Sequence, residues 1–175
     1  MNRAQLRLGF ILSALCVLIP LLAPLPLSTD PVAALMARPV MFLLTGVDVL
    51  LFALAAGFRR GVSIAFGFAA ATCTAVMTLM LLRDPGIDGT AASGFWMMVL
   101  GVWLASGLCV MVLADLKPRE AWQRRALDLA IPLLFGIVVF YLWEVLVRGA
   151  GVPAVLLPAP SGAAAKFVSS LPILS

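Results

Sequence analysis

Histidine is absent from the 175-residue sequence, tyrosine occurs once, and charged residues make up only 11% of the chain. Without histidine, the sequence lacks the side chain most often used for acid–base catalysis near neutral pH. It also has no partner that would let Cys16, Cys73 or Cys109 complete a zinc, haem or Cys/His catalytic set. Each cysteine lies inside an apolar run, as expected for a small buried hydrophobe. These absences argue against an enzyme, and we expect no catalytic residues, bound metal or cofactor.

Hydrophobic residues, in contrast, make up 63% of the chain. Ordinary soluble domains contain roughly half apolar and a quarter charged residues, so this composition predicts a membrane protein. The net charge of +4 does not indicate nucleic-acid binding, because the basic residues lie in short clusters between apolar runs instead of along one face.

Five apolar segments approach the roughly 20 residues that a helix needs to cross a bilayer. We therefore predict an all-α, polytopic membrane helix bundle with five transmembrane helices. Arginines before the first segment are also typical of a signal peptide, but no clear Ala-x-Ala cleavage site follows. We expect Pro20, Pro24 and Pro26 to kink or end that helix instead. The five segments are residues 8–27, 40–58, 62–82, 95–114 and 129–147.

Lysines and arginines are unequally divided between the two sides of such a bundle. Because positive loops tend to stay in the cytoplasm, we predict a cytoplasmic N-terminus and a periplasmic C-terminal segment. The organisation predicted is four helices in residues 1–114, a basic cytoplasmic connection in 115–128, and a fifth helix with its tail in 129–175. Trp122 and the neighbouring arginines would suit a short helix on the inner leaflet, although an ordinary positive loop is the alternative. The predicted cytoplasmic residues are Arg3, Arg7, Arg59, Arg60, Lys117, Arg119, Arg124 and Arg125, and the predicted outer ones are Arg38, Arg83, Arg148 and Lys166.

One carboxylate, Asp48, lies near the middle of the second apolar segment. An aspartate at that depth costs about 2.5 to 3.5 kcal/mol, so it needs a partner or a proton. Thr72 and Thr74 of the third segment lie at a similar depth and are candidate donors, which makes these three residues a candidate intramembrane polar site. A structural role is one interpretation and a proton or ion relay is the other.

Close helix packing is indicated by small residues four positions apart. Alanine and glycine are common throughout these segments, so the pattern predicts a compact bundle and no particular partner. The pairs are Ala65 and Ala69, Gly67 and Ala71, and Gly101 and Ala105.

The fifth segment should begin near Pro132, which a first helical turn tolerates, and should end at the outer interface. There Glu144 and Arg148 have the favourable i, i+4 order. Beyond it, Ser161 is placed to cap a short amphipathic helix over residues 162–171.

This tail resembles the start of the permease subunit of bacterial ABC importers of the nitrate, sulfonate and taurine type. The resemblance covers about 50 residues, from residue 125 onward. It implies a membrane-spanning permease subunit in the bacterial inner membrane that transports a small organic or inorganic solute. It also implies ABC ATPase subunits, a second permease copy and a periplasmic binding protein as partners. The matching residues are Leu142, Trp143, Glu144, Val152, Pro153, Leu156, Leu157, Pro158, Pro160 and Ser161.

The chain departs from that family in two ways. The Glu-Ala-Ala loop that docks the ATPase would lie after residue 175, and the first four segments look like an N-terminal extension. No GxxxxGK[ST] phosphate loop occurs, so nothing within these 175 residues could itself hydrolyse ATP. The alternative is a small accessory or structural subunit of a larger inner-membrane complex, such as a tripartite carboxylate transporter.

Overall fold

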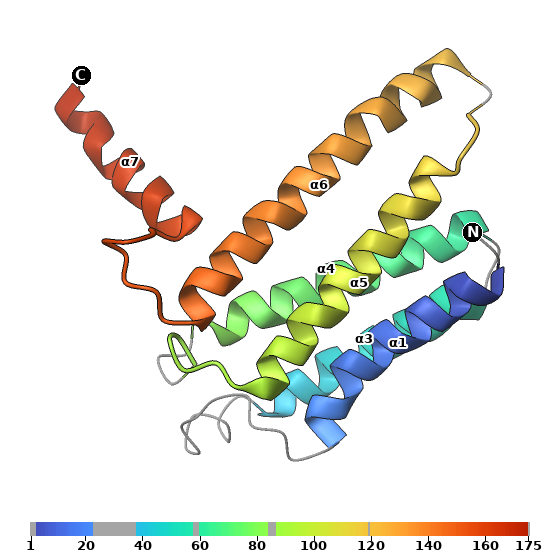
Figure 1. Cartoon of the computed structure of the whole chain (residues 1–175), viewed down its shortest axis with the longest axis horizontal. Helices are drawn as coiled ribbons and strands as arrows, with labels where there is room; N and C mark the ends of the chain where they lie inside the picture. The colour runs from blue at the N-terminus through green and yellow to red at the C-terminus, as the bar shows by residue number, and fades with distance from the viewer. Residues whose placement is uncertain (1–2, 23–37, 58–59, 84–86, 119, 175) are drawn as a thin grey trace.

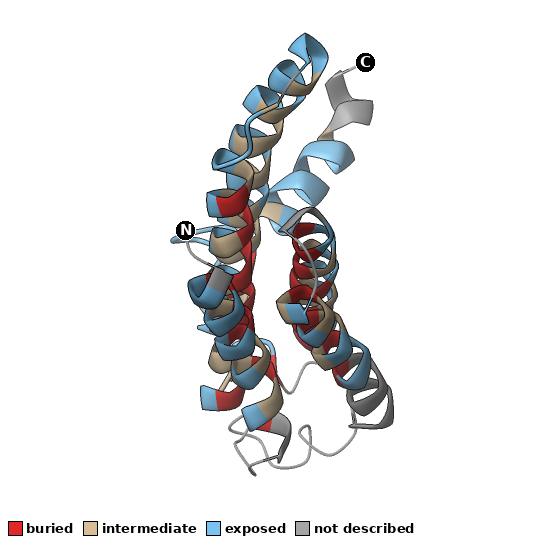
Figure 2. Cartoon of the chain, turned by 90° about the vertical axis from the view of Figure 1, so that its right-hand side faces the viewer, coloured by how far each residue is buried: buried red, intermediate tan, exposed pale blue. Residues whose placement is uncertain are grey.

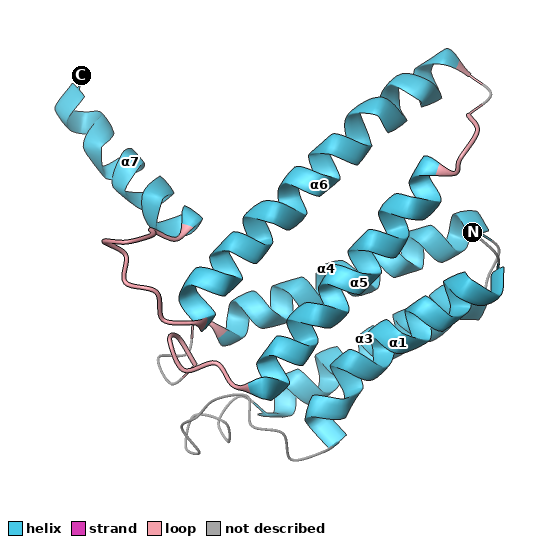
Figure 3. Ribbon diagram, in the orientation of Figure 1, coloured by secondary structure: helices cyan, strands magenta, loops and turns pink. Residues whose placement is uncertain are grey.

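The computed structural model describes residues 3–22, 38–57, 60–83, 87–118 and 120–174. Within these ranges the regular structure is helical and no strand occurs (Figure 3), so the all-α prediction is confirmed. The helices are α1 (Arg3–Leu22), α3 (Arg38–Gly57), α4 (Arg60–Leu81), α5 (Ser93–Ala114), α6 (Ala121–Gly149) and α7 (Pro160–Leu174).

Helices α1, α3, α4 and α5 form a four-helix bundle, hereafter the bundle (Figure 1). Each of them packs against two others of the set, α1 and α4 against both α3 and α5. Phe10 and Phe52, whose rings lie 6.4 Å apart, are at its centre and are almost fully buried. Buried residues follow the inner faces of the bundle helices, whereas most of α6 is exposed or half-buried (Figure 2).

Small residues explain how closely the bundle helices approach one another. A Cβ atom at Gly67 of α4 would lie 2.6 Å from a ring carbon of Phe10, so only glycine leaves room for this ring. A Cβ atom at Gly101 of α5 would lie 3.2 Å from the Ser13 carbonyl oxygen of α1. These glycines and their partners Ala71 and Ala105 are buried, as the small-residue spacing predicted. The third predicted pair, Ala65 and Ala69, is exposed and does not mark a packed face.

Three helices are long and apolar enough to cross a membrane, at Val62–Leu81, Ser93–Ala114 and Ala121–Gly149. The described parts of α1 and α3 contain shorter apolar helices, Ala4–Pro20 and Thr45–Gly57. This composition and these lengths support the prediction of a membrane protein. The first helix, described as far as Leu22, continues through Pro20, whereas Pro24 and Pro26 lie outside the described residues.

Helix α6 begins at Ala121, eight residues before the predicted start of the fifth segment. The sequence before residue 129 is polar but consists mostly of good helix formers, and Glu120 and Gln123 form a capping box at its start. Residues 121–128 are therefore the first turns of α6, neither a loop nor a separate helix. At 29 residues the helix is about 43 Å long, more than the roughly 30 Å of a hydrocarbon core. Pro132 accordingly lies in the helix interior, and its predicted position in the first turn is wrong.

Candidate functional site: an ionic cluster where helix α6 ends

Four side chains meet where α6 ends and α7 begins, and we call Asp88, Glu144, Arg148 and Ser161 the ionic cluster. Glu144 is buried on the inner side of α6. Its carboxylate accepts hydrogen bonds from the backbone N–H of Ser161 (2.9 Å) and from the Ser161 hydroxyl (2.6 Å). A carboxylate at a helix N-terminus satisfies a free N–H group and interacts favourably with the helix dipole. Glu144 thus fixes the start of α7 onto the end of α6.

The predicted role of Ser161 as N-cap is wrong. Helix α7 begins at Pro160, so Ser161 is its second residue. Proline tolerates the first position of a helix because its missing N–H group would have no partner there. The Ser161 hydroxyl consequently donates outward, to Glu144, and the cap comes from another helix.

Arg148 connects the two carboxylates of the cluster. One turn after Glu144, its Nη1 lies 3.6 Å from Glu144 Oε1, which confirms the predicted i, i+4 pair. Its Nη2 lies 2.7 Å from Asp88 Oδ2, and its Nε lies 3.4 Å from Asp88 Oδ1. The guanidinium also donates to the carbonyl of Leu82 near the end of α4. A single cation therefore ties α6 to the connection between α4 and α5.

Backbone contacts reinforce this attachment without side chains. The N–H of Gly89 donates to the Arg148 carbonyl (2.8 Å), and the N–H of Ala91 donates to the Gly149 carbonyl (3.3 Å). Gly89 and Gly151 both have positive φ, and a Cβ atom at Gly151 would lie 3.0 Å from the backbone of Gly89. This contact requires glycine, since a side chain would meet the facing main chain.

The remaining residues of the permease-like motif are placed around this cluster. Trp143 stacks on Phe140 with ring centroids 6.0 Å apart. The carbonyl of Pro153 accepts the N–H groups of Leu156 and Leu157, which makes a turn of the proline segment. Pro153 and Pro158 are exposed, and Pro160 begins α7. A hollow of about 510 Å³ opens here, with Arg148, Lys166 and Asp88 among its walls.

Asp88 was not identified from the sequence as a member of the cluster. The partner lies 60 positions away, beyond the reach of local patterns. The available signal was that Asp88 lies between the third and fourth apolar segments, in the same connection as Arg83, which was predicted on the same side as Arg148.

The predicted intramembrane polar site is separate from the ionic cluster and lies inside the bundle. Asp48 is completely buried, and Thr74 of α4 donates its hydroxyl to Asp48 Oδ2, as predicted. Thr72 does not take part, because it is exposed and donates to the Phe68 carbonyl of its own helix (2.8 Å). Within the described residues, Asp48 Oδ1 has no hydrogen-bond partner.

A polar ladder continues from this site toward α6. The hydroxyl of Thr78, one turn beyond Thr74, lies 3.2 Å from the Thr74 carbonyl and 2.8 Å from the Tyr141 hydroxyl. The ladder joins α3, α4 and α6 through buried or half-buried polar groups. No group of three metal-ligating side chains occurs among the residues that the structure describes.

Comparison with known proteins gives no relative for this chain: no family model matches it, and neither the curated proteins nor the solved structures give a significant match. The geometry of the two polar sites and the sequence pattern that led to them are therefore the basis for a functional proposal.

Proposed function

We propose that this chain is the N-terminal part of a membrane-spanning permease subunit of an ABC importer for a small organic or inorganic solute. The observation that carries the proposal is the pair of hydrogen bonds from Ser161 to Glu144. These residues belong to the two halves of the permease-like motif, Trp-Glu and Pro-Ser, and lie 17 positions apart. Their contact gives the spacing between the two halves a physical reason, since it determines how α7 leaves the end of α6.

The exposed surface of α6 supports the same proposal. Apolar side chains lie exposed along most of this helix, and its buried residues are confined to the last two turns. In the proposed permease, α6 is the first core helix, and later helices of the same subunit cover this surface. The exposed apolar residues of α6 outside its contact with α5 include Leu129, Leu133, Ile137, Val139 and Phe140.

We further propose five membrane-spanning helices, with the N-terminus in the cytoplasm of a bacterium and α7 on the periplasmic side of its inner membrane. Figure 1 supports this arrangement, because the start of α1, the end of α3 and the start of α4 lie toward one end, as do the end of α5 and the start of α6. Most of the lysines and arginines were predicted to lie near these helix ends, and positively charged residues favour the cytoplasmic side of a membrane. The partners of the proposed permease are a second permease copy, two ATPase subunits and a periplasmic binding protein.

The test is affinity purification of the natural protein from its own membrane, followed by mass spectrometry of the intact chain and of the proteins that accompany it. The proposal expects a chain much longer than 175 residues together with an ATPase. A chain ending at Ser175 that accompanies large membrane subunits without an ATPase would instead support the accessory subunit of a tripartite carboxylate transporter or similar complex.

A matched pair of variants links this test to the ionic cluster. Glu144→Gln and Glu120→Gln each remove one carboxylate, at opposite ends of α6. If the motif serves transport, solute uptake in cells should fall for Glu144→Gln and stay close to wild type for Glu120→Gln. Equal uptake by the two variants would count against a role of the motif in transport.

A further inference from the structure

Helices α5 and α6 run side by side from the ionic cluster toward the opposite end of the molecule (Figure 1). The buried residues of α6, Glu144, Val145, Val147 and Gly149, all lie near its C-terminal end. The rest of α6 is exposed or half-buried, and two hollows lined by residues of both helices form a cleft between α5 and α6.

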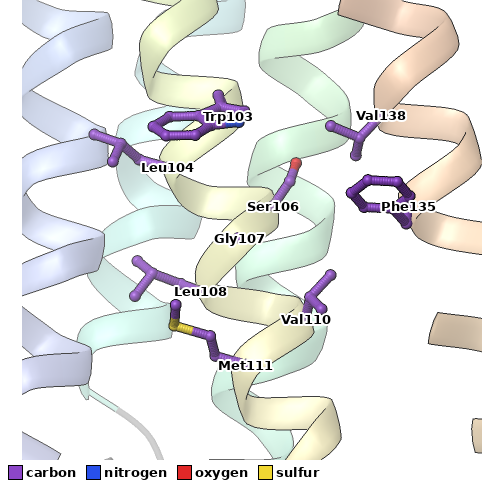
Figure 4. Close-up of a pocket in the computed structure, with 9 residues that line it drawn as sticks. All are labelled: Trp103, Leu104, Ser106, Gly107, Leu108, Val110, Met111, Phe135 and Val138. Carbon is purple, nitrogen blue, oxygen red and sulfur yellow. The ribbon is translucent and has the colours of Figure 1, made fainter. Parts of the chain in front are cut away.

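The middle of this cleft is an apolar groove of about 310 Å³. Trp103, Gly107 and Val110 line it from α5, and Phe135 and Val138 line it from α6. Figure 4 shows Phe135 and Val138 on the α6 side and Ser106 and Val110 on the facing side of α5. Ser106 supplies its one polar side chain apart from the indole of Trp103.

One helical turn further, the character of the cleft changes. A second hollow of about 420 Å³ is lined by Leu113 of α5 and Ile131 of α6, directly beyond the residues of the groove. Its outer walls carry the exposed cations Lys117 and Arg124 and one exposed carboxylate, Asp128. The hollow therefore has an excess of one positive charge at the mouth of an apolar groove.

We propose that this cleft binds one anionic phospholipid, with an acyl chain in the groove and its phosphate between Lys117 and Arg124. An amphiphile matches both parts of the cleft at once. A free anion would leave the apolar groove unfilled, and an apolar helix would leave the excess positive charge of the hollow without a counter-charge. Trp122, which is 65% exposed in the first turn of α6, has the amphipathic ring typical of the headgroup level. The proposal does not depend on the transport function proposed above.

Native mass spectrometry of the full natural chain, isolated from its own membrane in mild detergent, tests the proposal. The probes are phosphatidylglycerol and phosphatidylcholine with identical acyl chains, and glycerol phosphate as the headgroup without chains. We expect one retained phospholipid per chain, preference for phosphatidylglycerol, and no competition by glycerol phosphate at equal concentration.

Two variants examine the two ends of the lipid separately. Lys117→Gln with Arg124→Gln should weaken phosphatidylglycerol binding roughly thirtyfold, as expected for two basic residues near an anionic headgroup, and should remove the preference over phosphatidylcholine. Arg83→Gln with Lys166→Gln is the matched control, because it removes two cations from the opposite end of the molecule.

Gly107→Leu should fill the groove and weaken the binding of both lipids, since a Cβ atom at Gly107 meets nothing within 4 Å. Gly136→Leu, which also adds a side chain into open space but does not line the groove, is its control.

Equal binding of the two lipids by the wild type would overturn the proposal, as would competition by glycerol phosphate as strong as that of phosphatidylglycerol. Wild-type affinity in either test variant would overturn it as well. Should the double variant fail to fold, the lipid preference of the wild type and the Gly107→Leu result decide the matter.

Discussion

The bundle and the arm formed by α6 and α7 are held by different kinds of contact. Bundle helices pack along their lengths through apolar side chains such as Phe10 and Phe52. The arm joins the bundle mainly near the end of α6, through Val145, the ionic cluster, the backbone bonds of Gly89 and Ala91, and the Thr78–Tyr141 hydroxyl pair. Apolar packing therefore builds the bundle, whereas polar contacts mainly determine the direction of α6 relative to the bundle.

This difference has a physical reason in a membrane. Lipid chains are as apolar as leucine, so an exposed apolar helix loses little there by standing away from its neighbours. Polar groups, in contrast, have no water to replace a lost partner in the hydrocarbon. The Thr78–Tyr141 hydroxyl pair, which is buried or half-buried, therefore influences the position of the arm more than a similar contact in water would.

The largest effect should come from the bundle core. Phe10→Ala removes a fully buried ring that fills the space beside Gly67, and should lower the free energy of unfolding by about 3 to 5 kcal/mol. Denaturant unfolding in detergent measures this loss. Phe167→Ala in the exposed α7 is the control and should stay within about 0.5 kcal/mol of wild type. Similar losses in both variants would remove the distinction between bundle and arm.

Next comes the polar site inside the bundle. Thr74→Val removes the only hydrogen bond recorded for the buried carboxyl of Asp48 in the described residues, and should cost about 1 to 3 kcal/mol. Thr72→Val is an isosteric control on the same helix, where the exposed hydroxyl bonds only its own backbone. We expect the same unfolding measurement to separate the two variants, and equal stabilities would mean that Asp48 does not depend on Thr74.

The attachment of the arm should respond less strongly. Arg148→Gln removes the charged contacts with Asp88 and Glu144, and should destabilise the docked connection by about 1.5 kcal/mol, the low end for charged hydrogen bonds, because the site is partly exposed. Hydrogen exchange at the amides of Gly89 and Ala91 should become roughly tenfold faster. Arg83→Gln is the control. Unchanged exchange in Arg148→Gln would show that the backbone bonds hold the connection by themselves.

The smallest effect concerns α7 alone. Ser161→Ala removes the hydroxyl bond to Glu144 but keeps the backbone bond, and should cost about 1 kcal/mol. Faster hydrogen exchange in the first turn of α7 would report this loss. The control, Ser169→Ala, removes a hydroxyl that bonds the Lys166 carbonyl one turn away. If both variants exchange alike, the contact with Glu144 does not stabilise the helix start.

The sequence predicted the helices best where apolar runs and helices coincide. Helices α4 and α5 begin and end within about two residues of the predicted segments 62–82 and 95–114. The start of α6 was misplaced because apolar length reports the thickness of a bilayer, whereas a helix also continues through polar residues such as Gln123 and Arg124. The predicted first-turn position of Pro132 followed from that error.

For the polar sites, depth along a helix was predictable and rotation about its axis was not. Asp48 and Thr74 were identified from their shared depth, but the same argument admitted Thr72, which lies on another face of α4. The pair of Glu144 and Arg148 followed from their spacing on one helix. Asp88 contacts Arg148 only in the folded chain, so no local sequence pattern predicted this contact.

The ionic cluster also has a consequence for how the chain enters a membrane during its synthesis. Asp88 precedes α5 and Arg148 ends α6, so two long apolar helices separate the two members of this ion pair. The pair can form only if both helices cross the membrane, or if neither does, since a single crossing leaves the carboxylate and the guanidinium on opposite faces. Contact between Asp88 and Arg148 therefore distinguishes a chain in which both helices have crossed the membrane from one in which a single crossing is missing. The contact forms after insertion and requires no other protein.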